Sequence, residues 1–194
     1  MAANVYLDSV DAKGYDTQTA ATVIAHNIAG KPGKRVAIRA FGCTSGATAT
    51  KVYFMTSLGT TTLVSAAASG ASELALTAQP VSGNNLAASD WVCVVQDAGA
   101  YHFSLVFSVV GFTVISLCTV LTGAAAAGQT VYDLGAFGDD GHFPFNLTAS
   151  AQTTKEIDGG IFYGKSSAPM RVQHANDAAA AGSIDYVTID YLDI

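Results

Sequence analysis

The residues best suited to chemistry form one short cluster, Asp139-Asp140-Gly141-His142. Two carboxylates and an imidazole this close together could bind a divalent cation. Asp and Gly are also typical of a solvated turn, because Asp bonds nearby backbone groups and Gly adopts left-handed angles. We favour the turn. The sequence therefore predicts no metal ion, and Asp139, Asp140 and His142 remain weak candidates for binding one.

No other group of residues has the spacing of a catalytic site. Ser, His and Asp all occur, but no Gly-x-Ser-x-Gly stretch presents a nucleophile, and no phosphate-binding glycine motif follows a strand. Cys43, Cys93 and Cys118 are too far apart for a typical metal motif. Cys93 and Cys118 lie in apolar runs, where a free Cys behaves as a small buried hydrophobe. We expect no enzyme and no cofactor.

The charged residues are few and unevenly spread. They make up 12% of the chain, with a net charge of −6, against about a quarter in average domains. Residues 52–154 hold six acidic side chains and no basic one. The basic group of Lys31, Lys34, Arg35 and Arg39 could contact an acidic partner but is too sparse for nucleic acid. A low-charge surface favours burial against neighbouring copies, so we expect a homo-oligomer and no nucleic acid.

A long uncharged stretch, HFSLVFSVVGFTVISLCTVL (His102–Leu121), could be a membrane span or part of a sheet. It is long enough to cross a bilayer. However, it contains several Ser and Thr residues, no Lys or Arg flanks it, and its Val, Ile and Phe residues suit a pleated strand. We predict a hairpin, with arms Tyr101–Val110 and Phe112–Leu121 joined at Gly111, and no membrane contact.

Two segments near the N-terminus predict neighbouring strands, Arg35–Phe41 and Thr50–Thr56, joined by a Gly/Ser/Thr turn. Thr19–Ala29 fits a short helix or a strand equally well. No leader peptide is expected at the N-terminus, because a charged region followed by an apolar one is missing. In the first strand, period-two alternation places Val36, Ile38 and Ala40 on one face and Arg35, Arg39 and Phe41 on the other.

Further short strands are predicted from alternation and turn residues in the middle and C-terminal parts. GAFGDDGHFPFNL (135–147) is predicted to be a loop because of its Gly, Pro and paired Asp residues. Turns are expected at Asp90 and at Asp97–Gly99, with His102 as a structural residue. The strand segments are Ser72–Thr77, with Leu74 and Leu76 inward, and Trp91–Gln96, Thr130–Leu134, Lys155–Tyr163 and Pro169–His174.

The last segment, Ser183–Ile194, alternates almost perfectly and is predicted to be a strand at a sheet edge. Ile184, Tyr186 and Leu192 would face one side, and Val187, Ile189 and Tyr191 the other. Apolar residues on both sides indicate that both faces are covered, either within the subunit or by a neighbour. The resulting interface candidates are Arg35, Arg39, Ile184, Tyr186, Ile189 and Tyr191.

Strand-rich segments without a confident helix predict an all-β protein, an antiparallel β-sandwich or small β-barrel, with one or two β subdomains. Residues 61–135 are expected to form a compact barrel-like module. Residues 1–60 are expected to supply the N-terminal strands of a β-sandwich, and residues 136–194 the C-terminal strands that complete it.

The middle of the chain resembles a compact β module of tailed-phage virion structural proteins. The resemblance covers about Ser69–Gly135, roughly a third of the chain, and rests on a pattern of strands and turns. One step departs from it, because Ser89 stands where that module usually has Gly. The matching elements are Leu86 to Asp90, Val92 to Val95, Asp97 and Gly99, Tyr101 and His102, Phe103 to Val120, and Ala127 to Tyr132.

This resemblance implies a non-enzymatic virion protein, made in the host cytoplasm, that decorates or cements a capsid. Its partners would be further copies of itself and the major capsid protein or other virion proteins. A tail or neck component is the alternative within virions. A carbohydrate-binding or adhesin module is the alternative outside them, since Tyr53, Trp91, Tyr163 and Tyr186 could form a sugar platform.

Overall fold

The computed structural model describes residues 25–47, 49–80, 85–136, 139, 142–150, 152–156, 162–174 and 183–194. For residues 152–156, 183, 185 and 186 the description is limited to the backbone. Within these ranges every regular element is a β-strand, and the sheets are antiparallel. The all-β prediction is therefore confirmed. No described segment is a helix long and apolar enough to cross a membrane.

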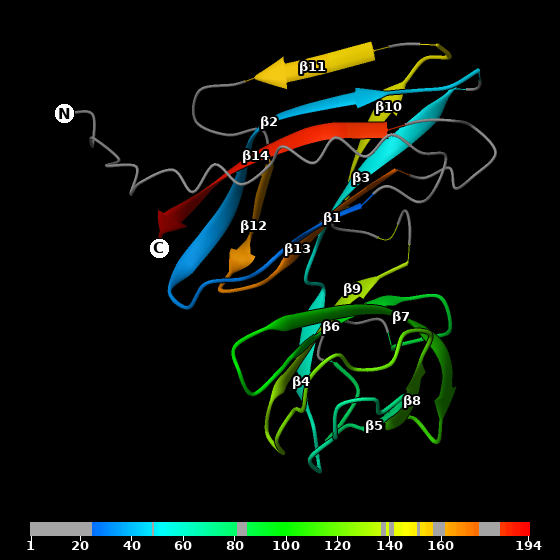
Figure 1. Ribbon diagram of the computed structural model, residues 1–194, viewed down its shortest axis with the longest axis vertical. Coiled ribbons are helices and arrows are strands. Elements are labelled where there is room, and N and C mark those ends of the chain that lie inside the picture. Colours follow the sequence, from blue (N-terminus) through cyan, green and yellow to red (C-terminus); the bar gives the residue numbers. More distant parts are fainter. Residues whose placement is uncertain are drawn as a thin grey trace. The chain divides into compact units, whose positions relative to one another are not determined.

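The chain divides into two compact units, each of which is described by itself (Figure 1). The flanking unit comprises residues 1–54 and 142–194, and the middle unit comprises residues 55–141. The domain boundaries predicted from the sequence, 60/61 and 135/136, lie a few residues inside the ends of the middle unit.

The flanking unit is a β-sandwich built from both ends of the chain. One sheet has the order β1-β13-β3-β10, and in the other β2 pairs with β11, β12 and β14. Apolar side chains of both sheets meet in one core. The strands are β1 (Ala25–Ile28), β2 (Lys34–Thr44), β3 (Thr50–Thr56), β10 (Phe143–Leu147), β11 (Gln152–Glu156), β12 (Phe162–Ser166), β13 (Met170–His174) and β14 (Ser183–Asp193).

Bulges change which side chains of β2 and β14 enter this core. The register between the two strands skips Arg39 on β2 and Asp185 on β14. An extra residue reverses the alternation beyond it. Phe41 is consequently fully buried in the core, and the prediction that it shares a face with Arg39 is wrong. Ile184 likewise joins Val187 and Ile189 in the core, so the predicted division of their faces is also wrong.

Two further predictions about this unit are corrected. β2 and β3 are not paired neighbours but lie in opposite sheets, with the rings of Phe41 and Phe54 packed edge-on at 5.1 Å. The segment predicted as a loop contains β10, which pairs with β3. Pro144 fits this strand because β10 is the last strand of its sheet, where a missing N–H group breaks no ladder.

The middle unit is a six-stranded sheet with the order β4-β9-β6-β7-β8-β5. It curls so that residues just beyond its two edge strands meet, through an antiparallel bridge between Leu63 and Leu76. Twelve buried aliphatic side chains, Leu74 and Leu76 among them, fill the curled sheet. The strands are β4 (Gly59–Thr62), β5 (Glu73–Ala75), β6 (Trp91–Val95), β7 (Tyr101–Val110), β8 (Val114–Leu117) and β9 (Thr130–Gly135).

The predicted hairpin is present, because β7 pairs with β8 in antiparallel register and Gly111 has φ +58° in the turn between them. β7 matches the predicted first arm, whereas β8 is shorter than the predicted second arm, Phe112–Leu121. The turn at Asp97 is also present, with Gly99 at φ +74°. His102 is buried, and its Nε2 lies 3.0 Å from the Thr119 carbonyl oxygen, which fits the predicted structural role. Cys118 is exposed rather than buried, because it lies just past the end of β8.

Candidate interaction surface

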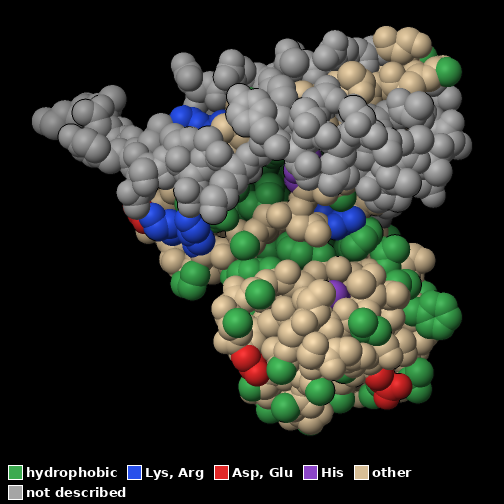
Figure 2. Space-filling view, in the orientation of Figure 1, with side chains coloured by type: hydrophobic (Ala, Val, Ile, Leu, Met, Phe, Trp, Pro, Cys, Tyr) green, Lys and Arg blue, Asp and Glu red, His purple; other side chains and the backbone are tan. Residues whose placement is uncertain are grey.

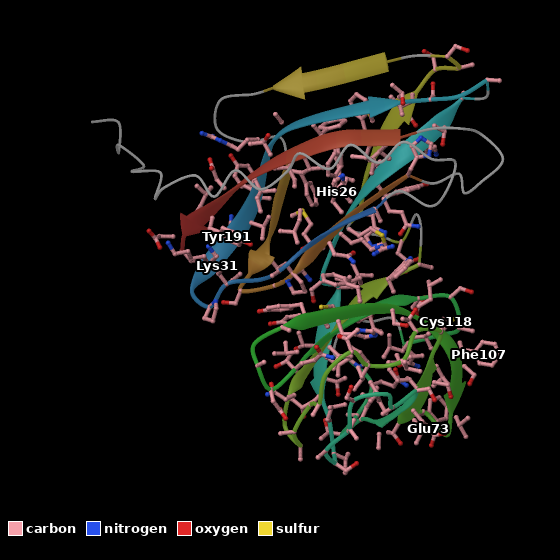
Figure 3. The ribbon with its side chains drawn as sticks, viewed as in Figure 1. His26, Lys31, Glu73, Phe107, Cys118 and Tyr191 are labelled. Atoms are coloured by element: carbon pink, nitrogen blue, oxygen red, sulfur yellow. The ribbon has the colours of Figure 1, made fainter. Side chains whose placement is uncertain are left out.

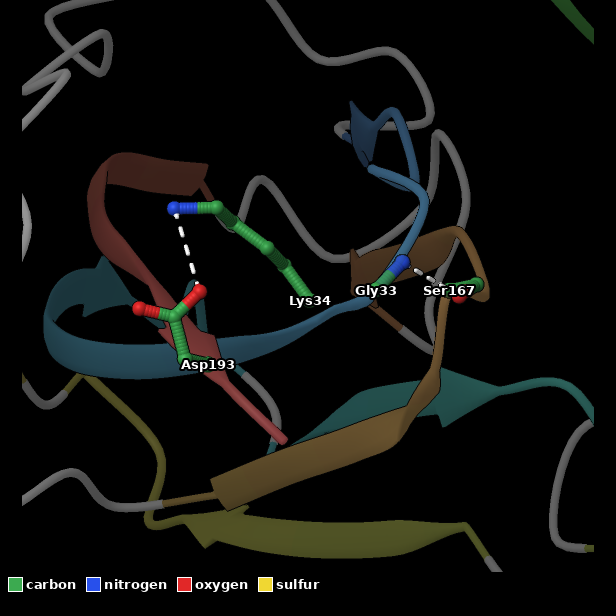
Figure 4. Close-up of polar contacts among 4 residues, drawn as sticks. All are labelled: Gly33, Lys34, Ser167 and Asp193. Atoms are coloured by element: carbon green, nitrogen blue, oxygen red, sulfur yellow. Dashed lines mark hydrogen bonds and ion pairs between the residues drawn. The ribbon is translucent and has the colours of Figure 1, made fainter.

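The predicted basic group lies at one end of the flanking unit, where the Lys31–Gly33 turn leads into β2. The Lys34 backbone N–H donates to the Lys31 carbonyl oxygen at 3.1 Å, which closes the turn. The turn is tied to the segment after β12 by two more bonds. Gly33 N–H donates to Ser167 Oγ at 2.9 Å (Figure 4), and Ser167 N–H donates to the Lys34 carbonyl oxygen at 2.7 Å.

The end of β14 engages two of the four cations of this group. Lys31 Nζ lies 4.0 Å from the centroid of the Tyr191 ring, and Figure 3 places the two side chains together. Tyr191 is fixed in turn because its hydroxyl donates to the Ala29 carbonyl oxygen at 2.8 Å. Lys34 Nζ lies 3.5 Å from Asp193 Oδ1 (Figure 4), an exposed pair of the kind that stabilises little.

Arg39 is held more firmly than the lysines. Its Nε lies 2.6 Å from Oδ2 of Asp190, and the Asp190 side chain is only 2% exposed. A buried carboxylate of this kind depends on its cation, because it has lost its hydration. Arg35 is exposed on β2, and within the described ranges no carboxylate pairs with it. Arg35 is therefore the member of the group best placed to contact an acidic partner.

The remaining interface candidates lie on β14. This strand pairs with β2 along its whole length, so it completes the sandwich of its own subunit. Ile184 and Ile189 are buried in that sandwich core, and Tyr191 is half-buried against it. The Tyr186 side chain lies outside the described residues. The apolar side chains expected to face a partner are thus used within the subunit.

The candidate metal cluster is not assembled by the described residues. Asp139 Oδ2 accepts a hydrogen bond from Ala136 N–H at 2.8 Å, the turn-forming role that the sequence favours. Asp140 lies outside the described residues, and His142 belongs to the flanking unit while Asp139 belongs to the middle unit. Among the described side chains, no group of three His, Cys, Asp or Glu residues could hold a metal ion.

Asp139 also affects a carboxylate of its own unit. Burial raises the pKa of Asp90, and the negative charge of Asp139 raises it further. The Ala87 N–H group, which donates to Asp90 Oδ2 at 2.7 Å, works in the opposite direction. The Asp90 N–H also donates to the Ala87 carbonyl oxygen at 3.3 Å, so the turn expected at Asp90 is present on the N-terminal side of this residue.

The four aromatics proposed as a sugar platform are dispersed. Trp91 lies in the middle unit, while Tyr53 and Tyr163 lie on opposite sheets of the flanking unit. Tyr53 does line an open groove of about 490 Å³, formed where β3 begins and its partner β10 ends. Its neighbours there include Lys51, Asn146 and Thr148, whose side chains can hydrogen-bond a hydroxylated ligand. Sequence reasoning missed this groove, because it takes β10 to be a loop.

Comparison with known proteins gives no relative for this arrangement. No protein-family model matches the chain, and no curated protein or solved structure matches it significantly.

Proposed function

We propose that this protein is a non-enzymatic structural component of a phage virion that decorates or cements the capsid. It would act as a homo-oligomer in contact with the major capsid protein. Burial of its low-charge surface against the shell and against neighbouring copies would stabilise the particle.

One observation carries this proposal. The segment that resembles virion β modules, about Ser69–Gly135, falls within one compact curled sheet with its own core. That unit contains no Lys or Arg. The Lys and Arg side chains visible in Figure 2 accordingly belong to the flanking unit. A rigid module with few charges suits packing into an assembly, where each buried charge would have to be desolvated.

Purified particles of the phage that encodes the chain provide the test. The protein should be present in many copies per particle, and antibody labelling should mark the shell. Removing it should lower the temperature at which the shell releases DNA, and adding it back should restore that temperature. Labelling confined to the tail or neck would place it there instead, and its absence from purified particles would overturn the proposal.

The groove lined by Tyr53, Lys51 and Asn146 supports carbohydrate binding as a second candidate function. An aromatic ring beside amide, hydroxyl and ammonium groups is a common way to bind a sugar. A glycan array with the wild-type chain tests this candidate. A specific hit should disappear in Tyr53→Ala and persist in Tyr163→Ala, a matched change on the opposite sheet. No hit on the array would exclude this candidate for the glycans tested.

A further inference from the structure

The middle unit has an apolar face that its own fold leaves uncovered. Phe107, Val110 and Phe112 are 71%, 62% and 70% exposed. Figure 3 shows Phe107 pointing away from the sheet, and Figure 2 shows hydrophobic side chains protruding at the edge of this unit. The inward positions of β7 are taken by His102, Ser104 and Val106. The outward positions form what we call the hairpin face, which consists of Phe103, Leu105, Phe107, Val110, Phe112 and Val114.

A bulge at Phe107 determines which later residues of β7 join this face. The register between β7 and β8 passes from Val106 opposite Leu117 to Ser108 opposite Ser116, which leaves Phe107 as an extra residue. Bulges re-aim side chains and reverse the alternation beyond them. Val109 therefore packs against the core and Val110 faces outward, whereas Phe107 has the outward position that ordinary alternation after Val106 gives it.

An unusual backbone conformation places the Phe112 ring on the outside. Phe112 has φ +68° in the turn that follows β7. A bulky residue rarely adopts this left-handed region, and Asn or Gly would fit it without strain. The buried core of the described unit is entirely aliphatic. The left-handed conformation at Phe112 thus costs stability and holds a Phe ring outside beside the exposed Phe107, which indicates a binding role.

The charge distribution indicates what covers this face. No Asp, Glu, Lys or Arg occurs between Asp97 and Asp133, and the whole middle unit lacks a basic residue. An anionic membrane would repel such a unit, because membrane-surface segments rely on Lys and Arg. A charged protein partner would find a single charge at the border of this face, Glu73, which lies opposite Ser116 on the neighbouring strand. A second copy of the same neutral face is compatible, because a two-fold contact sets like against like.

We propose that the hairpin face is a self-association surface that binds the hairpin face of a second copy of this chain. At roughly 200 Å² for a fully exposed ring, Phe107 and Phe112 together present about 300 Å². A standard interface buries about 800 Å² per partner. The two rings would form the apolar centre of the contact, and the half-buried neighbours would enlarge it. This inference rests on the self-association part of the proposed function.

Sedimentation of the purified full-length chain at about 1–100 μM, without particles, tests the inference. The wild type should pass from 19.8 kDa toward twice that mass as concentration rises. The double variant Phe107→Ser/Phe112→Asn should stay monomeric over the same range, a weakening of at least tenfold. Asn suits the backbone at position 112, so this variant should keep its circular dichroism spectrum and melt cooperatively. Val64→Ser, which changes a 57% exposed side chain elsewhere in the unit, should associate like the wild type.

The results that would overturn this inference differ from those that would overturn the proposed function. A wild type that stays at 19.8 kDa throughout, or a folded double variant that associates as the wild type does, would overturn the inference. Flotation of the wild type with vesicles of anionic phospholipid, lost in the double variant, would overturn it in favour of a membrane. None of these results bears on whether the chain is found in particles. Conversely, a chain that associates through this face but is absent from particles would remove the proposed function alone.

Discussion

The two units bury different kinds of side chain. In the flanking unit, rings of Phe41, Phe54 and Phe145 pack edge-on, with centroids 4.9 and 5.1 Å apart. In the described part of the middle unit the core is aliphatic, and Phe107 and Phe112 are on the outside. Among the described residues, the fully buried Phe rings thus lie in the flanking unit and the most exposed Phe rings in the middle unit. Composition by itself therefore does not tell which side of a strand is buried.

The units also differ in how far along the chain their contacts reach. Every strand of the middle unit lies between residues 59 and 135, whereas the flanking unit joins β1, β2 and β3 to strands that begin at residue 143. Contacts between distant segments cost more loop-closure entropy before they stabilise anything. The stability of the flanking unit should therefore depend more strongly on each of its strands than the stability of the middle unit does.

Deletion of residues 183–194 is expected to have the largest effect. It removes the buried Ile184, Val187 and Ile189 from the sandwich core, each contributing about 1.5–3 kcal/mol. The total approaches the whole stability of an ordinary domain. We expect the shortened chain to lose soluble expression, or to show a flanking unit without protected amides in hydrogen exchange. An unchanged melting temperature would mean that β14 is dispensable.

Residues 55–141 alone provide the matched comparison. This fragment retains all strands of the middle unit and its core, so it should fold independently. A strand-type circular dichroism spectrum and a cooperative melt are expected. If the fragment remains unfolded, the contacts within residues 55–141 are not sufficient for folding. The proposed difference between the two units would then be wrong.

Arg39→Ala should have the next largest effect, because it leaves the buried Asp190 carboxylate without its cation. The loss of one partner of a buried pair costs about 3–5 kcal/mol. Lys34→Ala is the control within the same unit, because its partner Asp193 is 74% exposed, and it should cost less than about 1 kcal/mol. Urea denaturation measures both variants. If both variants lose the same free energy of unfolding, the burial of Asp190 does not determine how much its ion pair with Arg39 stabilises the unit.

Substitutions at two glycines distinguish the cost of a steric clash from the cost of an unusual backbone conformation. A Cβ at Gly30 would collide with the Ser167 carbonyl oxygen and lie 2.9 Å from the Ala168 carbonyl carbon. Gly30→Ala should therefore cost about 1–3 kcal/mol, as overpacking does. At Gly111 there is open space, and the constraint is φ +58°. Gly111→Asn should be nearly neutral by thermal melting, since Asn tolerates this conformation, whereas Gly30→Asn should be at least as harmful as Gly30→Ala.

Asp90→Asn is expected to have the smallest effect. Burial raises the pKa of Asp90 in the folded chain, so the folded state binds its proton more readily than the unfolded state does. This carboxyl therefore favours folding most at low pH, and its contribution declines as pH rises through the raised pKa. Asn can still accept the bond from Ala87. The variant should melt slightly higher than the wild type at pH 7, and the difference should shrink toward pH 4. A lower melting temperature at pH 7 would contradict this assignment.

Local sequence determined where most strands form. Alternation and turn residues predict β6, β7 and β9 closely, and Gly111 marks the hairpin turn because only a few residue types adopt its angles. The all-β class follows from the same signals, since they depend on neighbours within a few residues. The exposed hairpin face of the middle unit was not predicted, although its residues lie in the stretch that the sequence predicts as a hairpin.

Tertiary structure decided which sides are buried and which strands meet. Bulges at Arg39, Asp185 and Phe107 reverse the alternation, and nothing local in the sequence marks them, because a bulge forms where a strand adjusts to its partner. β10 becomes a strand despite Pro144 because β3, far away in sequence, offers it an edge. β2 and β3 lie in opposite sheets, rather than pairing, because the core between them is completed by strands from the other end of the chain.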